Sequence, residues 1–186
     1  MSTQNPGKEL QDLKNSVGMT VTLISFAMMF ATMFLGFFLV RFNSPVWPPV
    51  EISNMPVLLP LLSTLVMALS SATYFMLEKK SEQRKLYWAA TIALGVIFLV
   101  LQWNLWGALK ASGILASNGQ VPSMVYAFTW IHAAHIVLGL ATLMWLGHLI
   151  FRKPEAVTEL KLINVGKFWH FLGVVWLFMY LMLFVL

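Results

Sequence analysis

The chain of 186 residues contains no cysteine and few charged side chains. Without cysteine, disulfides, thiolate metal sites, iron–sulfur clusters and thiol nucleophiles are excluded. Charged residues make up only 10% of the chain, whereas a soluble domain carries about 25%. Hydrophobic residues make up 59%. The composition therefore excludes a water-soluble globule and indicates an integral membrane protein.

Carboxylates are missing from the apolar stretches. A membrane span needs about 20 apolar residues, and five stretches qualify: residues 17–40, 57–77, 86–109, 122–151 and 164–186. None of the seven Asp and Glu residues lies in these stretches. Buried ionisable groups are costly in a bilayer and mark proton and ion pathways. The absence of carboxylates from these stretches argues against a pump, an antiporter or a proton path through this chain.

The distribution of positive charge predicts the topology. Of the 12 Lys and Arg residues, all except Arg41 and Lys110 lie in the amino-terminal segment, the second and fourth connections, or the start of the last span. The positive-inside rule then predicts a cytoplasmic amino terminus and an external carboxyl terminus. The expected fold is all-α: an integral membrane bundle of five transmembrane helices over residues 17–186, preceded by a mobile cytoplasmic tail over residues 1–16. The proline-rich connection 41–56 is expected to be an extended, ordered loop.

The four histidines raise the question of a haem or metal site. His132 and His135 share a helix face, as a metal pair would. They lie about 28 and 24 Å above the inner end of their span, whereas His170 and His148 lie only about 9 and 5 Å above theirs. Two axial ligands of one haem need nearly equal heights, so only His148 and His170 could pair. We interpret the histidines as hydrogen-bonded packing groups, with His132, His135 and His170 facing protein. A small haem-binding membrane cytochrome is the alternative.

Small and polar residues indicate contacts between helices. Thr64, Ala68 and Ser71 follow one another at i, i+4 and i+7 in the second span, a stripe that permits close helix approach. An unpaired amide in hydrocarbon is costly. We therefore expect Gln102 or Asn104 to hydrogen-bond to the fourth span. No catalytic, cofactor-binding or metal-ligating residue is assigned.

The last two spans contain two specific motifs. His132 and His135 lie in T-W-I-H-A-A-H-I-V-L-G, which is similar to T-G-x-H-x-x-H-V-x-x-G. Trp169, His170 and Trp176 lie in W-H-F-L-G-V-V-W-L-F, which is similar to W-H-F-x-D-x-V-W-L-F. Both motifs belong to haem–copper oxidase subunit III. Further segments match the W-P-P, L-P-L-x-N-T…S-S and L-G…L-Q motifs of that family at residues 47–49, 59–71 and 94–102. The resemblance covers residues 17–186 in consistent order.

The resemblance implies a non-catalytic accessory subunit III of a bacterial aerobic respiratory terminal oxidase of the cytochrome c oxidase type. Such a complex couples oxygen reduction to proton translocation in the bacterial cytoplasmic (inner) membrane. The chain would be the short five-helix form, stabilising the catalytic subunit I beside subunit II and binding structural phospholipids. Haems and copper would belong to the partner subunits, nucleic acid is not an expected partner, and a larger respiratory supercomplex is compatible with the resemblance. The alternative is a subunit III-like component of a quinol oxidase or a nitric oxide reductase.

Three carboxylates of the family are replaced in this chain. The resemblance places them at Phe30, Leu105 and Gly173. We therefore do not carry over a proton-antenna role, whereas the scaffold and lipid-binding expectations are unaffected. The expected packing and partner-contact residues are Gln102, His132, His135, Trp169, His170 and Trp176.

Overall fold

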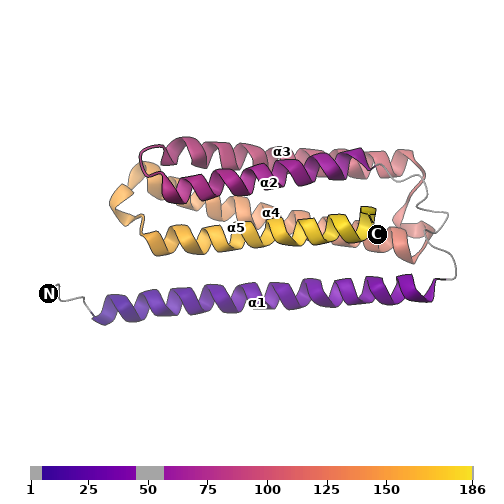
Figure 1. The fold of residues 1–186 in the computed structure, drawn as a ribbon, viewed down its shortest axis with the longest axis horizontal. Helices are drawn as coiled ribbons and strands as arrows, with labels where there is room; N and C mark the ends of the chain where they lie inside the picture. Colours follow the sequence, from indigo (N-terminus) through magenta and orange to yellow (C-terminus); the bar gives the residue numbers. More distant parts are fainter. Residues whose placement is uncertain (1–5, 45–56, 186) are drawn as a thin grey trace.

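Five long helices run nearly parallel to one another in the computed structural model, which describes residues 6–44 and 57–185 (Figure 1). They are α1 (Pro6–Asn43), α2 (Leu58–Lys79), α3 (Arg84–Ala111), α4 (Gln120–Arg152) and α5 (Glu159–Tyr180). Short helical turns η2 (Ala116–Asn118) and η3 (Pro154–Ala156) lie in the connections, and the π-helical η4 (Leu181–Val185) continues α5. Within the described residues, five helices are long and apolar enough to cross a membrane. The all-α, five-helix prediction is confirmed.

The helices extend beyond the predicted spans at both ends of the chain. α1 begins at Pro6, so the described residues before 17, which the sequence assigned to a tail, continue the first helix. Proline suits the first helical position because its missing N–H would be unpaired there. α5 begins at Glu159, where the Thr158 hydroxyl accepts a hydrogen bond from the Lys161 N–H at 3.4 Å. The predicted extended loop and the W-P-P motif at residues 47–49 lie outside the described residues.

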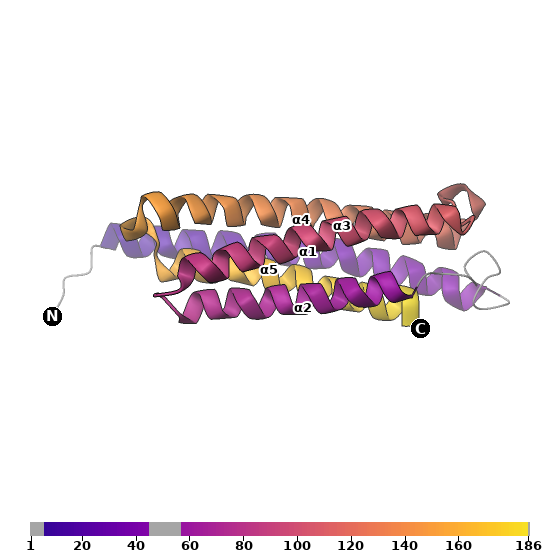
Figure 2. The ribbon, with the colours of Figure 1, turned by 90° about the horizontal axis from the view of Figure 1, so that it is seen from above.

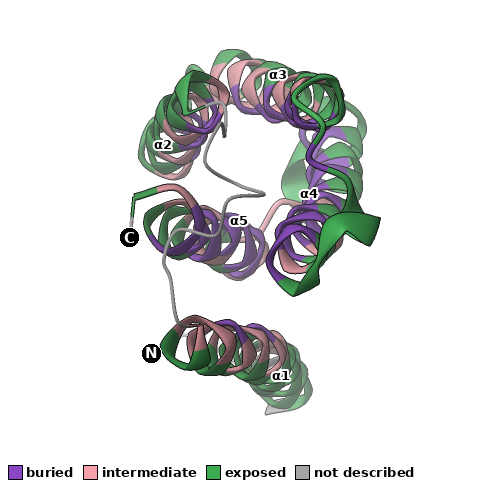
Figure 3. Ribbon diagram, turned by 90° about the vertical axis from the view of Figure 1, so that its right-hand side faces the viewer, coloured by how far each residue is buried: buried purple, intermediate pink, exposed green. Residues whose placement is uncertain are grey.

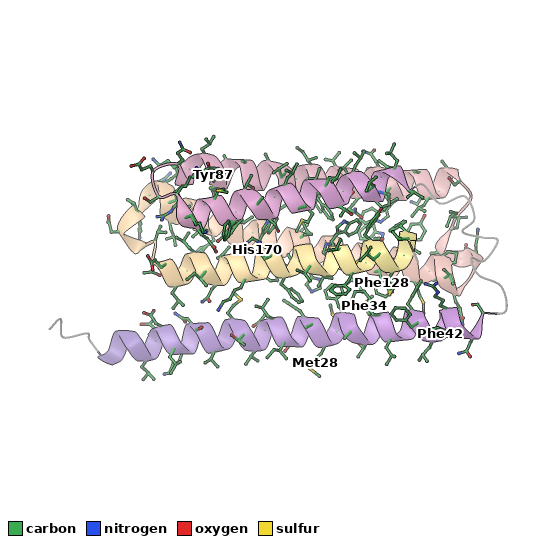
Figure 4. All side chains as sticks on the ribbon, viewed as in Figure 1. Met28, Phe34, Phe42, Tyr87, Phe128 and His170 are labelled. Atoms are coloured by element: carbon green, nitrogen blue, oxygen red, sulfur yellow. The ribbon has the colours of Figure 1, made fainter. Side chains whose placement is uncertain are left out.

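Helices α2 to α5 form a ring, which Figure 3 shows along the bundle, and α1 lies outside it (Figures 1 and 3). Only 11% of the most apolar part of α1 is buried, compared with 50% for α4 and 44% for α5. α1 contacts α4 and α5 through one face of phenylalanines. Phe34 stacks on Phe128 of α4 with 5.5 Å between ring centroids, whereas Met28 points away from the bundle (Figure 4). The first helix is therefore attached along one narrow aromatic seam, the face of α1 that carries Phe26, Phe30 and Phe34.

Trp169 connects the four helices of the ring. Its ring lies against two glycines, and a Cβ atom added to Gly95 of α3 or to Gly139 of α4 would come within 2.9 Å of ring carbons. Its Nε1 donates a hydrogen bond to the Ser70 hydroxyl of α2 at 3.1 Å. Trp88 of α3 lies against Gly147 of α4 in the same way and donates from Nε1 to the Leu143 carbonyl at 2.7 Å. Hydrophobic burial does not hold helices together in lipid, so such close contacts and interhelical hydrogen bonds supply the stability.

Candidate functional site

His132 lies at the centre of the bundle in a box of aromatic rings. It is fully buried, and its ring centroid lies 5.5 Å from that of Trp176, 5.8 Å from Phe98 and 6.3 Å from Phe30. Neither ring nitrogen has a hydrogen-bond partner. The prediction that His132 is a hydrogen-bonded packing group is therefore wrong. The surrounding rings from α1, α3 and α5 contact the imidazole in place of polar partners. Each buried ring nitrogen without a hydrogen bond lowers the stability of the fold by about 1–3 kcal/mol.

His135 lies one helical turn from His132, beside α1. It is 9% exposed, and its Nδ1 lies 2.7 Å from the Ile131 carbonyl of its own helix. Its ring meets those of Phe26 and Phe30, with centroids 4.7 and 5.4 Å away. Phe30 thus touches both imidazoles at the position where the family resemblance expects a carboxylate. The phenyl ring supplies an aromatic contact there and cannot exchange protons with the histidines.

His170 and His148 have different surroundings. His170 is half-buried and meets the Tyr74 ring of α2 edge-on, with 5.7 Å between ring centroids; Figure 4 labels His170 between α2 and α5. The Tyr74 hydroxyl donates to the Leu162 carbonyl at 2.8 Å, which ties α2 to the start of α5. His148 is exposed on α4. Among the described residues, no group of three or more His, Cys, Asp and Glu side chains could hold a metal ion.

Gln102 faces α2 rather than α4. Its Nε2 donates to the Ser63 hydroxyl at 3.3 Å and its Oε1 has no partner, while Asn104 is exposed. The prediction that Gln102 or Asn104 bonds to the fourth span is therefore wrong. The link between α3 and α4 comes instead from Trp106, whose Nε1 donates to the Thr129 hydroxyl at 3.0 Å. Neighbouring positions in a sequence show which face a residue occupies, but not which helix that face meets.

Replacing Gln102 by leucine should change the free energy of unfolding by less than about 1 kcal/mol. The substitution removes an orphaned buried carbonyl, and Ser63 keeps its 2.9 Å hydrogen bond to the Leu59 carbonyl. Unfolding in mixed micelles by titration with sodium dodecyl sulfate, followed by tryptophan fluorescence, measures the effect. A loss of several kcal/mol would contradict this expectation and show that the amide is required for the α2–α3 contact.

The small-residue stripe borders a groove between α2 and α5. Thr64 accepts a hydrogen bond from Trp176 Nε1 at 3.0 Å, whereas Ala68 is exposed and Ser71 is half-buried. The groove has a volume of about 320 Å³ and is lined also by His170 and Gly173. A Cβ atom at residue 173 would lie 3.1 Å from the Ser71 hydroxyl oxygen. The glycine that replaces the third family carboxylate thus leaves this groove open.

The other two replaced carboxylate positions lie in the core. Phe30 is 1% exposed and Leu105 is fully buried. Within the described ranges, no Asp or Glu side chain is buried. The buried polar side chains are Ser63, Ser70, Thr91, Gln102, Thr129, His132, His135 and Asn164. The interior is therefore aromatic and carboxylate-free over the part of the chain that the structure describes.

The fold and this interior define a multi-pass membrane protein whose motif residues Trp169 and Trp176 join neighbouring helices. Comparison with known proteins gives the family. A family model described as cytochrome c oxidase subunit III matches residues 9–186. The chain belongs to this family, which confirms the resemblance drawn from its motifs.

Individual relatives carry the same name. The chain is 26% identical to cytochrome c oxidase subunit 3 of Thermostichus vulcanus, over 91% of this chain and 86% of that protein. It is 30% identical to cytochrome c oxidase subunit 3 of Neurospora crassa, over 89% of this chain but 65% of the relative. It is also 30% identical to a probable cytochrome c oxidase subunit 3 of Rickettsia prowazekii, over 76% of this chain and 53% of the relative. The chain thus spans less than two thirds of the latter two relatives.

Proposed function

We propose that the chain is a non-catalytic accessory subunit III of a bacterial aerobic respiratory terminal oxidase of the cytochrome c oxidase type. In this role it stabilises the catalytic subunit I, lies in contact with subunit I and subunit II, and binds structural phospholipids. It resides in the bacterial inner membrane with its amino terminus in the cytoplasm. The family match over residues 9–186 is the observation that carries the proposal.

The exposed surface suits a subunit that works by contact. Large apolar side chains cover the outward face of α1, where lipid or neighbouring helices replace water. They include Val17, Val21, Ile24, Met28, Leu35 and Leu39, each more than half exposed. α2 and α3 likewise expose Leu65, Leu69, Val96, Ile97 and Val100. These faces offer contact area to other subunits and to lipid without supplying any reactive group.

The residues of this chain do not fit a haem. The His132 ring is enclosed by three aromatic rings, and His135 Nδ1 lies against a backbone carbonyl. His170 meets Tyr74, and His148 is exposed on another helix. We therefore assign the haems and copper of the proposed complex to the partner subunits, and derive no redox step through this chain.

Affinity purification of the full chain from its native membranes in mild detergent tests the proposal. The purified complex should contain a catalytic subunit with more than one haem and show its absorbance, because the chain assembles with it. The chain expressed alone should show no Soret band. A Soret band from the lone chain that disappears in His170→Leu would replace the proposal with a small membrane cytochrome, and recovery without any haem-bearing subunit would contradict it.

The replaced carboxylates favour a second candidate within the same class. Phe30, Leu105 and Gly173 stand where the resemblance places three carboxylates, which is compatible with a divergent branch of the family. A subunit III-like component of a quinol oxidase or a nitric oxide reductase would fit such a branch. Identifying the co-purified catalytic subunit, and assaying oxygen reduction with cytochrome c and with quinol, separates this candidate from the first.

A further inference from the structure

An aromatic pocket lies where α3 passes to α4. It has a volume of about 170 Å³ and is lined by Trp103, Trp106, Gly107, Lys110, Tyr126 and Trp130. Trp106 and Trp130 stack with their rings 3° from parallel and 4.2 Å between centroids. The ring of Trp103 meets that of Trp106 edge-on, with 6.2 Å between ring centroids. Trp130 stands where the motif of this segment has glycine, so the stack does not follow from the motif.

The polar side chains of this pocket that have no protein partner carry only hydrogen-bond donors. Trp106 Nε1 is used by Thr129, and the Tyr126 hydroxyl donates to the Ile114 carbonyl at 2.9 Å. The Lys110 ammonium and the indole N–H groups of Trp103 and Trp130 have no protein partner in the described part of the chain. These groups donate hydrogen bonds and cannot accept them. Trp103 is 70% exposed and Trp130 is 54% exposed, so both can be reached from outside. The pocket therefore suits an anionic, hydrogen-bond-accepting group.

Negative charge is absent from this end of the described bundle. The α2–α3 and α4–α5 connections lie at the opposite end from the α3–α4 connection (Figures 1 and 2). The acidic side chains of the described structure belong to that opposite end: Asp12, Glu78, Glu82, Glu155 and Glu159. No described carboxylate neutralises Lys110, and none would hold the cationic choline or ethanolamine of a zwitterionic lipid.

We propose that this pocket binds the phosphate of an anionic phospholipid headgroup such as phosphatidylglycerol. Lys110 pairs with the phosphate, Trp103 and Trp130 donate hydrogen bonds to its oxygens, and the stacked indoles contact the glycerol and the upper acyl chains. Lys110 lies in the last turn of α3, a helix long enough to span the membrane. Trp106 and Trp103 lie one and two helical turns before Lys110, and tryptophan is enriched at headgroup level near the ends of such helices, which favours a lipid over a soluble anion. The inference deepens the lipid-binding part of the proposed function and rests on it.

Binding to lipid nanodiscs tests the proposal with the full chain, together with any subunits that co-purify. Nanodiscs contain phosphatidylcholine and phosphatidylglycerol in equal amounts, and native mass spectrometry measures the retained lipid of each kind. Lys110→Gln should weaken retention of phosphatidylglycerol about fivefold. Trp130→Leu should weaken it as well, and Lys110→Arg should preserve it. Lys79→Gln is the matched control, because Lys79 is exposed in the last turn of α2 at the opposite end.

Three results would overturn the assignment. An equal loss of phosphatidylglycerol from Lys79→Gln would show that the effect comes from general surface charge and not from this pocket. Retention of phosphatidylcholine as strong as that of phosphatidylglycerol would indicate an aromatic cage for the choline cation. Loss of a co-purified subunit from Lys110→Gln, with lipid unchanged, would place a carboxylate of a partner protein in the pocket. Co-purification of the wild-type chain with an oxidase is scored separately, so failure of the proposed function and failure of the pocket assignment remain distinguishable.

Discussion

Replacing Trp169 by alanine should lower the free energy of unfolding by about 2–4 kcal/mol. The ring is 1% exposed, lies against Gly95 and Gly139, and donates to the Ser70 hydroxyl at 3.1 Å. The truncated side chain leaves a cavity beside α3 and α4, and the hydrogen bond to Ser70 of α2 is lost. The effect is smaller than for the same change in a soluble core, because the unfolded chain in lipid or detergent does not expose the indole to water.

Unfolding by titration with sodium dodecyl sulfate, followed by circular dichroism, measures this loss. Trp145→Ala is the matched control, since Trp145 is 51% exposed and Lys161 Nζ lies over its ring, 6.0 Å from the centroid. The control should lose less than about 1 kcal/mol. Equal losses in the two variants would show that Trp169 contributes by its bulk in the membrane and not by joining the four helices.

Replacing Gly139 by leucine should disrupt the bundle, with a loss of about 3 kcal/mol or more. The first carbon of the new side chain would lie 2.9 Å from Trp169 Cζ3 and 3.0 Å from Leu172 Cδ1, too close for either group to remain in place. α4 and α5 would have to separate along this contact. The amount of folded chain recovered from membranes and the unfolding midpoint in detergent both report the change.

Two further variants make this test specific. Gly36→Leu introduces the same side chain into α1, where an added Cβ atom meets nothing within 4 Å, and it should leave stability nearly unchanged. The double variant Gly139→Leu with Trp169→Ala should recover part of the loss, because the missing indole leaves room for the leucine. A Gly36→Leu variant as harmful as Gly139→Leu, or a double variant with strictly additive losses, would contradict the fit described for Trp169.

The fold could be predicted from the sequence because lipid permits few solutions. A bilayer requires long apolar segments whose backbone groups are satisfied internally, so five such segments predict five helices. The helix ends could not be predicted in the same way. Pro6 and Glu159 begin helices within polar sequence, where capping and helix propensity decide the boundary and hydropathy carries no information.

The interior could be predicted only in part. The motifs drew attention to His132 and Trp169, and both are buried at helix contacts. Their partners lie far away in the sequence: Trp176 and Phe98 for His132, Gly95 and Gly139 for Trp169. The aromatic enclosure that leaves His132 without a hydrogen bond depends on side chains from three other helices. No periodicity within α4 could reveal that arrangement.

The single aromatic seam of α1 has a consequence for how the protein is made. α1 is synthesised before α2 to α5, yet its ring contacts include Phe128, His132 and His135 of α4 and Phe168 of α5, which follow about 100 residues or more later. Because α2 to α5 pack against one another in a ring, α1 must wait in the bilayer as a separate span until they are made. Among these five helices, the one synthesised before the others is thus the last to find its binding face.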